Sequence, residues 1–148
     1  MEIGENVMNT IWKDIPGYEG MYQASIYGEI RSLDRKNVRK SKGGKIYNHS
    51  IRGKILQAGR YCKSGHLSVV LGRGTNGRPV HQLICLTFIG QCPEGLEVLH
   101  TDGNPLNNNL SNLRYGSRTE NIIDVLRIGR SWKKLNLEQV KDIKRRLA

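Results

Sequence analysis

One segment determines the predicted architecture of this chain, and it reads Leu99-His100-Thr101-Asp102-Gly103-Asn104-Pro105-Leu106-Asn107-Asn108-Asn109-Leu110-Ser111-Asn112-Leu113. An apolar stretch ends at His100, and a loop rich in glycine and asparagine follows it. Apolar residues return at Leu113, and Ser117 followed by Glu120 predicts the capping box of a helix that stops at Gly129. The predicted order is a strand over residues 97–100, a loop, a second strand over 113–115 and a helix over 117–127.

Two asparagines stand at set distances from this histidine. Asn112 lies 12 positions after His100, and Asn121 lies 21 positions after it. Together with Asp102-Gly103-Asn104, this pattern resembles the HNH nuclease motif, in which a small ββα unit holds one divalent metal ion against a phosphodiester. The resemblance implies that His100 is the general base and that Asn112 pins the loop. It also implies that Asn121, on the helix, is a metal ligand through its side-chain carbonyl.

These residue types suit phosphodiester hydrolysis. A histidine has an ordinary pKa near 6.5, and general-base catalysis contributes about 10² to 10⁴ in rate. A hard divalent cation orients the phosphate and stabilises the leaving oxygen. Many members of the family carry histidine at the last motif position. The asparagine at position 121 favours an oxygen-preferring ion, Mg²⁺ first and Mn²⁺ second, over zinc.

The motif departs from the family pattern at Leu99. Family members often carry Asp or Asn immediately before the histidine as a second metal ligand, and leucine cannot ligate. Three hypotheses follow. In the first, Asp102, on the same side as His100 in an extended chain, supplies the carboxylate. In the second, Asn121, water and the DNA phosphate hold the ion weakly. In the third, the centre has lost activity and keeps only DNA binding. Asp102 has a second interpretation as a loop-stabilising residue, like the asparagines beside it.

A helix is expected just before the motif, over residues 80–89. Pro79 suits the first helical position. Helical spacing is shown by Val80, Leu83, Ile84 and Phe88. His81 in this helix is interpreted as a structural residue in preference to a phosphate contact.

The region before the helix is predicted to be β-rich. Pro16-Gly17, Glu19-Gly20 and Tyr27-Gly28 separate short β-prone pieces, as in a small antiparallel unit. The pattern W-x-x-I-P-G-Y-E-G-x-Y-x-x-S-x-x-G-x-I-R-S-L, which starts at Trp12, resembles the small nuclease-associated modular domain found before phage-type HNH nucleases. That resemblance implies an accessory module and no catalyst. A further strand is predicted over residues 67–71.

Charge is strongly segregated along the chain, whose formal net charge is +11. Residues 31–78 hold thirteen basic residues and one acid, and residues 125–148 have a net charge of +6. Residues 79–124, with the motif, have a net charge of −3. A pI near 9.9 has a simple interpretation, which is that the charge keeps the protein soluble. The segregation of charge favours nucleic-acid binding instead, with a polyanion held by the basic arms and a cation held by the centre. The predicted DNA contacts are Arg35, Lys36, Arg39, Lys40, Lys42, Lys45, Arg52, Lys54, Arg114, Arg118, Lys133 and Lys134.

Several other features limit the class of protein. Residues 36–45 are expected to form a mobile basic loop. Residues 131–148 are expected to form a basic amphipathic helix, which resembles the opening helix of the helix-turn-helix units that often end such nucleases. No apolar run of about 18 residues predicts a membrane span, and the N-terminus lacks the pattern of a secretion signal, which predicts the cytoplasm of a bacterial host. Three cysteines are too few and too irregularly spaced for a disulfide framework or a zinc knuckle.

The predicted fold class is α+β, with a β-rich DNA-contacting module (10–78), a ββα-metal nuclease module (79–130) and a C-terminal basic helix (131–148). The leading hypothesis for function is a metal-dependent DNA endonuclease of the HNH homing type, found in phages and their bacterial hosts. It would act on double-stranded DNA as a monomer or a homodimer. The alternative is a DNA-binding protein with a vestigial nuclease centre, which Leu99 favours. A role without nucleic acid is a distant third hypothesis.

Overall fold

The chain begins with a small antiparallel sheet. The computed structural model describes residues 10–61, 63–129, 141 and 145–146. The first sheet has the order β1-β2-β3, from β1 (Trp12–Asp14), β2 (Tyr22–Ser25) and β3 (Ile30–Ser32). This confirms the antiparallel unit expected from the glycine-rich punctuation.

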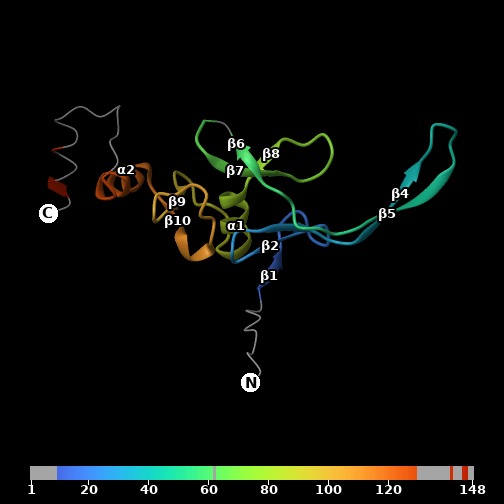
Figure 1. Cartoon of the computed structure of the whole chain (residues 1–148), viewed down its shortest axis with the longest axis horizontal. Helices are drawn as coiled ribbons and strands as arrows, with labels where there is room; N and C mark the ends of the chain where they lie inside the picture. Colours follow the sequence, from blue (N-terminus) through green and yellow to red (C-terminus); the bar gives the residue numbers. More distant parts are fainter. Residues whose placement is uncertain (1–9, 62, 130–140, 142–144, 147–148) are drawn as a thin grey trace, which may run out of the picture.

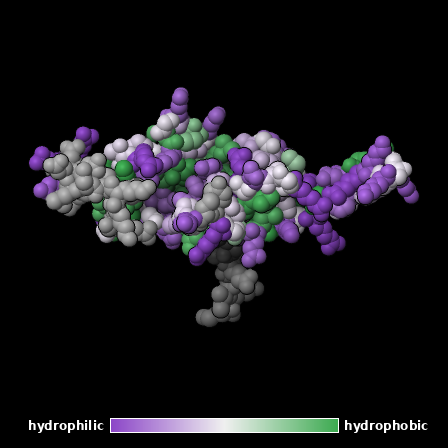
Figure 2. Space-filling model, turned by 90° about the horizontal axis from the view of Figure 1, so that it is seen from above, coloured by the Kyte–Doolittle hydropathy of each residue, from purple (hydrophilic) through white to green (hydrophobic). Residues whose placement is uncertain are grey.

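A long hairpin follows, where the sequence predicted a mobile loop. Strands β4 (Arg35–Lys40) and β5 (Ile46–Ile51) pair over six residues each, from Arg35 opposite Ile51 to Lys40 opposite Ile46. The backbone N–H of Ser41 donates to the Lys45 carbonyl at 2.9 Å and closes the turn. The prediction of a loop was wrong. The two strands are held by backbone hydrogen bonds, which form without an apolar face and so leave no sign in a basic sequence. The hairpin projects from the body of the molecule (Figure 1) and its surface is largely hydrophilic (Figure 2).

A third sheet leads into the first helix. Strands β6 (Gly59–Tyr61), β7 (His66–Val70) and β8 (Gly77–Pro79) pair antiparallel in that order, so the strand expected over 67–71 is present. Helix α1 (Val80–Phe88) starts directly after β8. Pro79 was predicted to be the first helical residue. It has extended backbone angles and instead precedes the first helical residue, Val80, as the N-cap.

The predicted ββα unit is confirmed. Strands β9 (Glu97–His100) and β10 (Leu113–Gly116) pair with His100 opposite Leu113, and a 3-10 turn, η1 (Leu110–Asn112), precedes β10. Helix α2 (Arg118–Arg127) has the expected capping box. Its Ser117 hydroxyl accepts from the Glu120 N–H at 3.2 Å, and the Glu120 carboxylate accepts from the Ser117 N–H at 2.6 Å.

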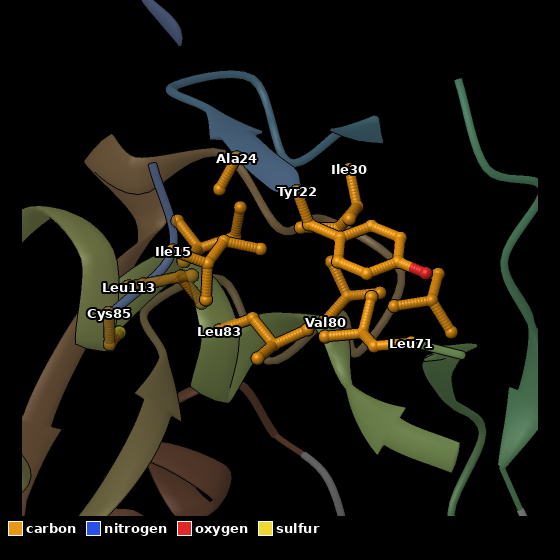
Figure 3. Close-up of a cluster of buried hydrophobic side chains, with 11 residues drawn as sticks. Ile15, Tyr22, Ala24, Ile30, Leu71, Val80, Leu83, Cys85 and Leu113 are labelled. Carbon is orange, nitrogen blue, oxygen red and sulfur yellow. The ribbon is translucent and has the colours of Figure 1, made fainter. Parts of the chain in front are cut away.

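One hydrophobic core lies on both sides of the predicted boundary at residue 79. Ile15, Tyr22 and Ile30 of the first sheet region point toward Val80 and Leu83 of α1 (Figure 3). The same cluster also includes Val69 and Leu71 near β7 and Leu113 of β10. The N-terminal sheet and the ββα unit therefore pack around α1 as one body.

The described part of the chain is elongated. The β4–β5 hairpin and α2 lie toward opposite ends of the long axis, with α1 between them (Figure 1). In the described residues, no helix combines the length and apolar character needed to cross a membrane. The C-terminal basic helix predicted over 131–148 falls almost entirely outside the described residues, so it stays a prediction.

Candidate active site

His100 ends β9 and is oriented by an asparagine of the loop that follows. Its Nε2 atom lies 3.0 Å from Oδ1 of Asn108, whose side chain is buried. With this amide orientation, Nε2 carries the proton and donates it to the carbonyl oxygen. The lone pair of Nδ1 is then left to accept a proton, as a general base requires.

Asn108 is a site residue that the sequence did not identify. Asn104, Asn107 and Asn108 were interpreted mainly as local loop chemistry, and nothing in the sequence distinguished Asn108 from the other two. Asn108 is held from the other side by the β2–β3 turn. A Cβ atom on Gly28, whose φ is +88°, would lie 2.8 Å from the Asn108 carbonyl carbon and oxygen. The backbone N–H of Leu110 also donates to the Ile26 carbonyl at 2.8 Å.

Asn112 and Asp102 close the loop between β9 and β10. The Asn112 side-chain oxygen accepts from the Asp102 N–H at 3.0 Å. Its amide nitrogen donates to the Asp102 carboxylate and to the Asn107 carbonyl, both at 2.9 Å. These bonds tie the residues just after His100 to the residues just before β10.

The Asp102 carboxylate is occupied inside the loop. It accepts from the Asn107 side chain and the Asn104 N–H, both at 2.8 Å, in addition to Asn112. The Asn107 side-chain bond, with the Asn104 and Asn112 bonds, lowers the pKa of this carboxyl below its ordinary value. This geometry favours the loop-stabilising interpretation of Asp102 over its interpretation as a metal ligand.

Leu99 and Asn121 stand at the two positions that the family resemblance assigns to metal ligands. Leu99 is 2 % exposed, and a Cβ atom on Gly116 would lie 2.5 Å from its Cδ1 atom, so the leucine packs against Gly116 of β10. Asn121, on α2, donates from its side-chain nitrogen to Oε1 of Glu97 at 2.9 Å. Glu97 is a site residue that no sequence motif indicated.

Two further histidines lie against His100. The ring centroid of His66, on β7, is 5.5 Å from that of His100, and His81, on α1, is 5.2 Å from it. Burial, with the nearby charges of His66 and His100, lowers the pKa of His81 to about 3, so this ring is neutral near pH 7. Its buried position agrees with the structural role favoured for it, although its Nδ1 atom has no hydrogen-bond partner among the described residues.

Strands β7 to β10 and helices α1 and α2 border a cleft of about 500 Å³, whose lining does not include His100. Its lining includes His66, Arg78, His81, Glu97, Tyr115 and Asn121. The cleft thus combines imidazole rings, a guanidinium and oxygen ligands, a chemistry suited to a phosphate group and a hard cation.

Two segments of the chain match known families. Residues 78–122 match the HNH endonuclease family, and residues 11–72 match the NUMOD4 motif. The chain carries an HNH endonuclease domain preceded by a NUMOD4 motif. His66 lies within the NUMOD4 match and His81 within the HNH match, so the cleft is lined from both.

Individual relatives agree with this assignment. The chain is 37% identical over 113 residues to DNA endonuclease I-HmuI of Bacillus phage SP01, covering 75% of this chain and 55% of that protein. It is 40% identical over 57 residues to YosQ of the Bacillus subtilis SPbeta prophage, which is named as a putative HNH homing endonuclease, covering 38% of this chain and 33% of that protein. The solved structure of I-HmuI, on DNA binding and cleavage by that enzyme, superimposes with a TM-score of 0.59 and 33% identity. That alignment covers 91% of this chain and 66% of the I-HmuI chain. The chain therefore spans about half the length of the phage relative.

Most of the predicted DNA contacts lie on or beside the β4–β5 hairpin, which falls within the NUMOD4 match. Exposed side chains there are Lys36, Lys40, Lys42, Lys45, Arg52 and Lys54. Arg39 is half-buried. Arg35 stacks on the Tyr22 ring, with its guanidinium carbon 5.1 Å from the ring centroid, at the base of the hairpin.

Two of the remaining predicted contacts lie on the HNH domain. Arg118 is exposed at the start of α2. Arg114 forms an ion pair with Asp124 and a weaker one with Glu120 at 3.9 Å, so it ties β10 to α2. Lys133 and Lys134 fall outside the described residues.

The three neighbouring histidines do not form a metal site with other side chains in the described part of the chain. Within it, no group of three or more His, Cys, Asp or Glu side chains could hold a metal ion. Cys85 is buried in the core, which raises the pKa of its thiol to about 11. Cys92 is exposed and its thiol lies 3.2 Å from the Leu96 carbonyl oxygen.

Proposed function

We propose that this protein is a metal-dependent DNA endonuclease that hydrolyses phosphodiester bonds with His100 as the general base. The observation that carries the proposal is the contact between His100 and Asn108, which fixes the protonated nitrogen and leaves Nδ1 as a base. The DNA endonuclease activity named for I-HmuI supports the substrate class. Relatives from a Bacillus phage and a prophage favour action inside a bacterial host cell.

The proton transfer follows from the tautomer of His100. Nδ1 accepts a proton from a water molecule as that water attacks the phosphorus and the P–O bond to the leaving oxygen breaks. The Asn108 carbonyl stabilises the Nε2–H of the resulting imidazolium. His81 is held neutral by burial, so it does not compete as a cation near the base at neutral pH. Asn112 keeps the loop fixed behind His100 through its bonds to Asp102.

The donor chemistry at the end of the cleft fits a hard divalent cation. Asn121 carries an amide oxygen at the position that family resemblance assigns to a ligand, and it borders the same cleft as His66 and His81. When bound, Mg²⁺ or Mn²⁺ would neutralise charge on the phosphate and stabilise the leaving oxygen. Asn112 and Asn121 thus have separate tasks, loop rigidity for one and metal binding for the other.

The β4–β5 hairpin is proposed to bind the DNA backbone. Its exposed lysines stand on a narrow, hydrophilic projection (Figures 1 and 2), which suits contacts to phosphates more than to a protein core. Such contacts carry little sequence information but fix the position of the duplex.

A second candidate function has one observation in its favour. Leu99 is buried where family members often carry a ligand, so the chain could act by occupancy of DNA with an inactive centre. The two functions differ in the fate of the DNA. The intact His100–Asn108 pair favours the enzyme, because an inactive centre has no need of an oriented base.

The test is plasmid cleavage under controlled metal conditions. Supercoiled plasmid is incubated with the protein in Mg²⁺, in Mn²⁺ and in EDTA, with DNA binding measured in parallel by gel shift. We expect nicked or linear product with either metal and none in EDTA. Binding of the plasmid without any cleavage in either metal would establish the occupancy function instead.

A further inference from the structure

We propose that Glu97 supplies the carboxylate ligand that Leu99 does not, so that Glu97 and Asn121 together hold the divalent ion. The proposal rests on the proposed function, because it names the ligand set of the same metal centre. It assigns to this chain a ligand position different from the residue before the histidine.

The geometry of β9 puts Glu97 in a suitable place. Glu97 and Leu99 are two residues apart on one strand, so their side chains lie on the same face of the β9–β10 pair. Leu99 is buried on that face against Gly116, while Glu97 is half-buried and borders the cleft. The ligand position has thus moved by one pleat along the strand, away from the leucine.

Direct contact links Glu97 to the predicted ligand on α2. Oε1 of Glu97 accepts from the Asn121 side-chain nitrogen at 2.9 Å. An amide can exchange its oxygen and nitrogen by rotation about its last bond, so Asn121 can present its oxygen on the side of Glu97. One carboxylate and one amide oxygen, completed by water and a substrate phosphate, are a sufficient ligand set for Mg²⁺.

The other carboxylates in or beside the HNH domain are either held by other partners or exposed away from Asn121. Asp102 is occupied by three hydrogen bonds inside the loop. Glu120 caps α2, and Asp124 pairs with Arg114. Glu94 is exposed in the segment before β9. Among the described carboxylates, Glu97 is the one that contacts Asn121, so it is the one placed to share an ion with it.

The test is metal binding, measured apart from activity. ¹⁵N-labelled protein is titrated with MnCl₂, and the paramagnetic broadening of backbone amides is followed by NMR. We expect broadening centred on residues 97 and 121. Glu97→Gln keeps an oxygen that accepts from Asn121, so its thermal unfolding should match the wild type. Its Mn²⁺ affinity should fall by at least about tenfold, the size of effect that follows even when residues that only support a ligand are changed. Glu94→Gln, which removes the same charge three residues earlier, should bind Mn²⁺ as the wild type does.

Two outcomes would overturn the inference, and both are separable from failure of the proposed function. If Glu97→Gln binds Mn²⁺ like the wild type, Glu97 is not a ligand, whatever the plasmid assay shows. If broadening centres away from residues 97 and 121, the site is elsewhere. The plasmid assay on the wild type decides the proposed function independently, because cleavage in Mg²⁺ can occur with any ligand set.

Discussion

The oriented imidazole of His100 depends on one side chain, Asn108. A neutral amide oxygen fixes the tautomer without adding charge, so the ring can take up a proton during the reaction without a fixed negative charge beside it. The same residue is buried, and Gly28 packs against its backbone and Cβ atom.

Asn108→Asp tests this dependence. A carboxylate in place of the amide still accepts from Nε2–H, but its negative charge also stabilises the imidazolium. We expect the pH at which cleavage reaches half its maximum to rise by about one unit. Asn104→Asp adds the same charge to the same loop at an exposed position and should leave the profile nearly unchanged. Equal profiles for Asn108→Asp and the wild type would show that the Asn108 contact does not act on the base.

His81 gives the fold a specific pH dependence. Its pKa is lowered to about 3 by burial, so between about pH 6.5 and 3 the unfolded chain binds a proton at this ring that the folded chain does not. Stability is therefore fully present above about pH 6.5 and falls as the pH drops, with a slope of at most about 1.4 kcal/mol per unit from this group. His81→Phe should flatten the dependence of the urea midpoint on pH over that range. A slope equal to the wild type's would assign the effect to other groups, such as His66, whose pKa burial also lowers.

At the scale of elements, the ββα unit and the hairpin differ in how far the sequence could predict them. The capping box at Ser117 and the asparagine loop act within a few residues, so α2 and the strand–loop–strand order could be predicted locally. The hairpin could not, because its strands are held by backbone pairing across a five-residue turn and have exposed side chains on both faces. Glu97 and Asn108 were missed for a similar reason, since their partners lie 24 and 8 residues away, across the ββα unit and the loop.

The hairpin lysines should govern the salt dependence of DNA binding. Changing Lys40, Lys42 and Lys45 together to Gln removes three exposed charges. The log–log slope of the binding constant against salt should become shallower by about 0.9 for each phosphate of B-form DNA that the variant no longer neutralises. Lys13→Gln, on β1, serves as a control for general charge. An unchanged slope in the triple variant would place the DNA elsewhere.

At the scale of the whole molecule, the NUMOD4 region and the HNH domain are packed together as one unit. They share a core around α1 (Figure 3), His66 reaches the cleft from β7, and the β2–β3 turn supports the Asn108 backbone. The sequence indicated a boundary near residue 79 because the composition and the motifs change there. It could not show that one core crosses this boundary, because the contacts join residues far apart in the chain.

Gly28→Ala tests whether the N-terminal region supports the active site. Alanine at a φ of +88° is strained, and its Cβ would lie 2.8 Å from the Asn108 backbone, which must then shift. Gly20→Ala has similar strain at a φ of +70° but meets nothing within 4 Å. Both variants should lose about 1–2 kcal/mol of stability from the backbone. Only Gly28→Ala should lose cleavage rate, measured well below either melting temperature. Equal rates in the two would show that the turn does not position the base.

The central claim, that His100 is the general base, is tested most directly by His100→Ala in single-turnover plasmid cleavage with Mg²⁺, with DNA affinity and thermal unfolding measured beside it. General-base catalysis contributes about 10² to 10⁴ in rate, so cleavage should fall by that factor while DNA affinity stays within about twofold of the wild type. Cleavage by His100→Ala at the wild-type rate would show that His100 is not the general base.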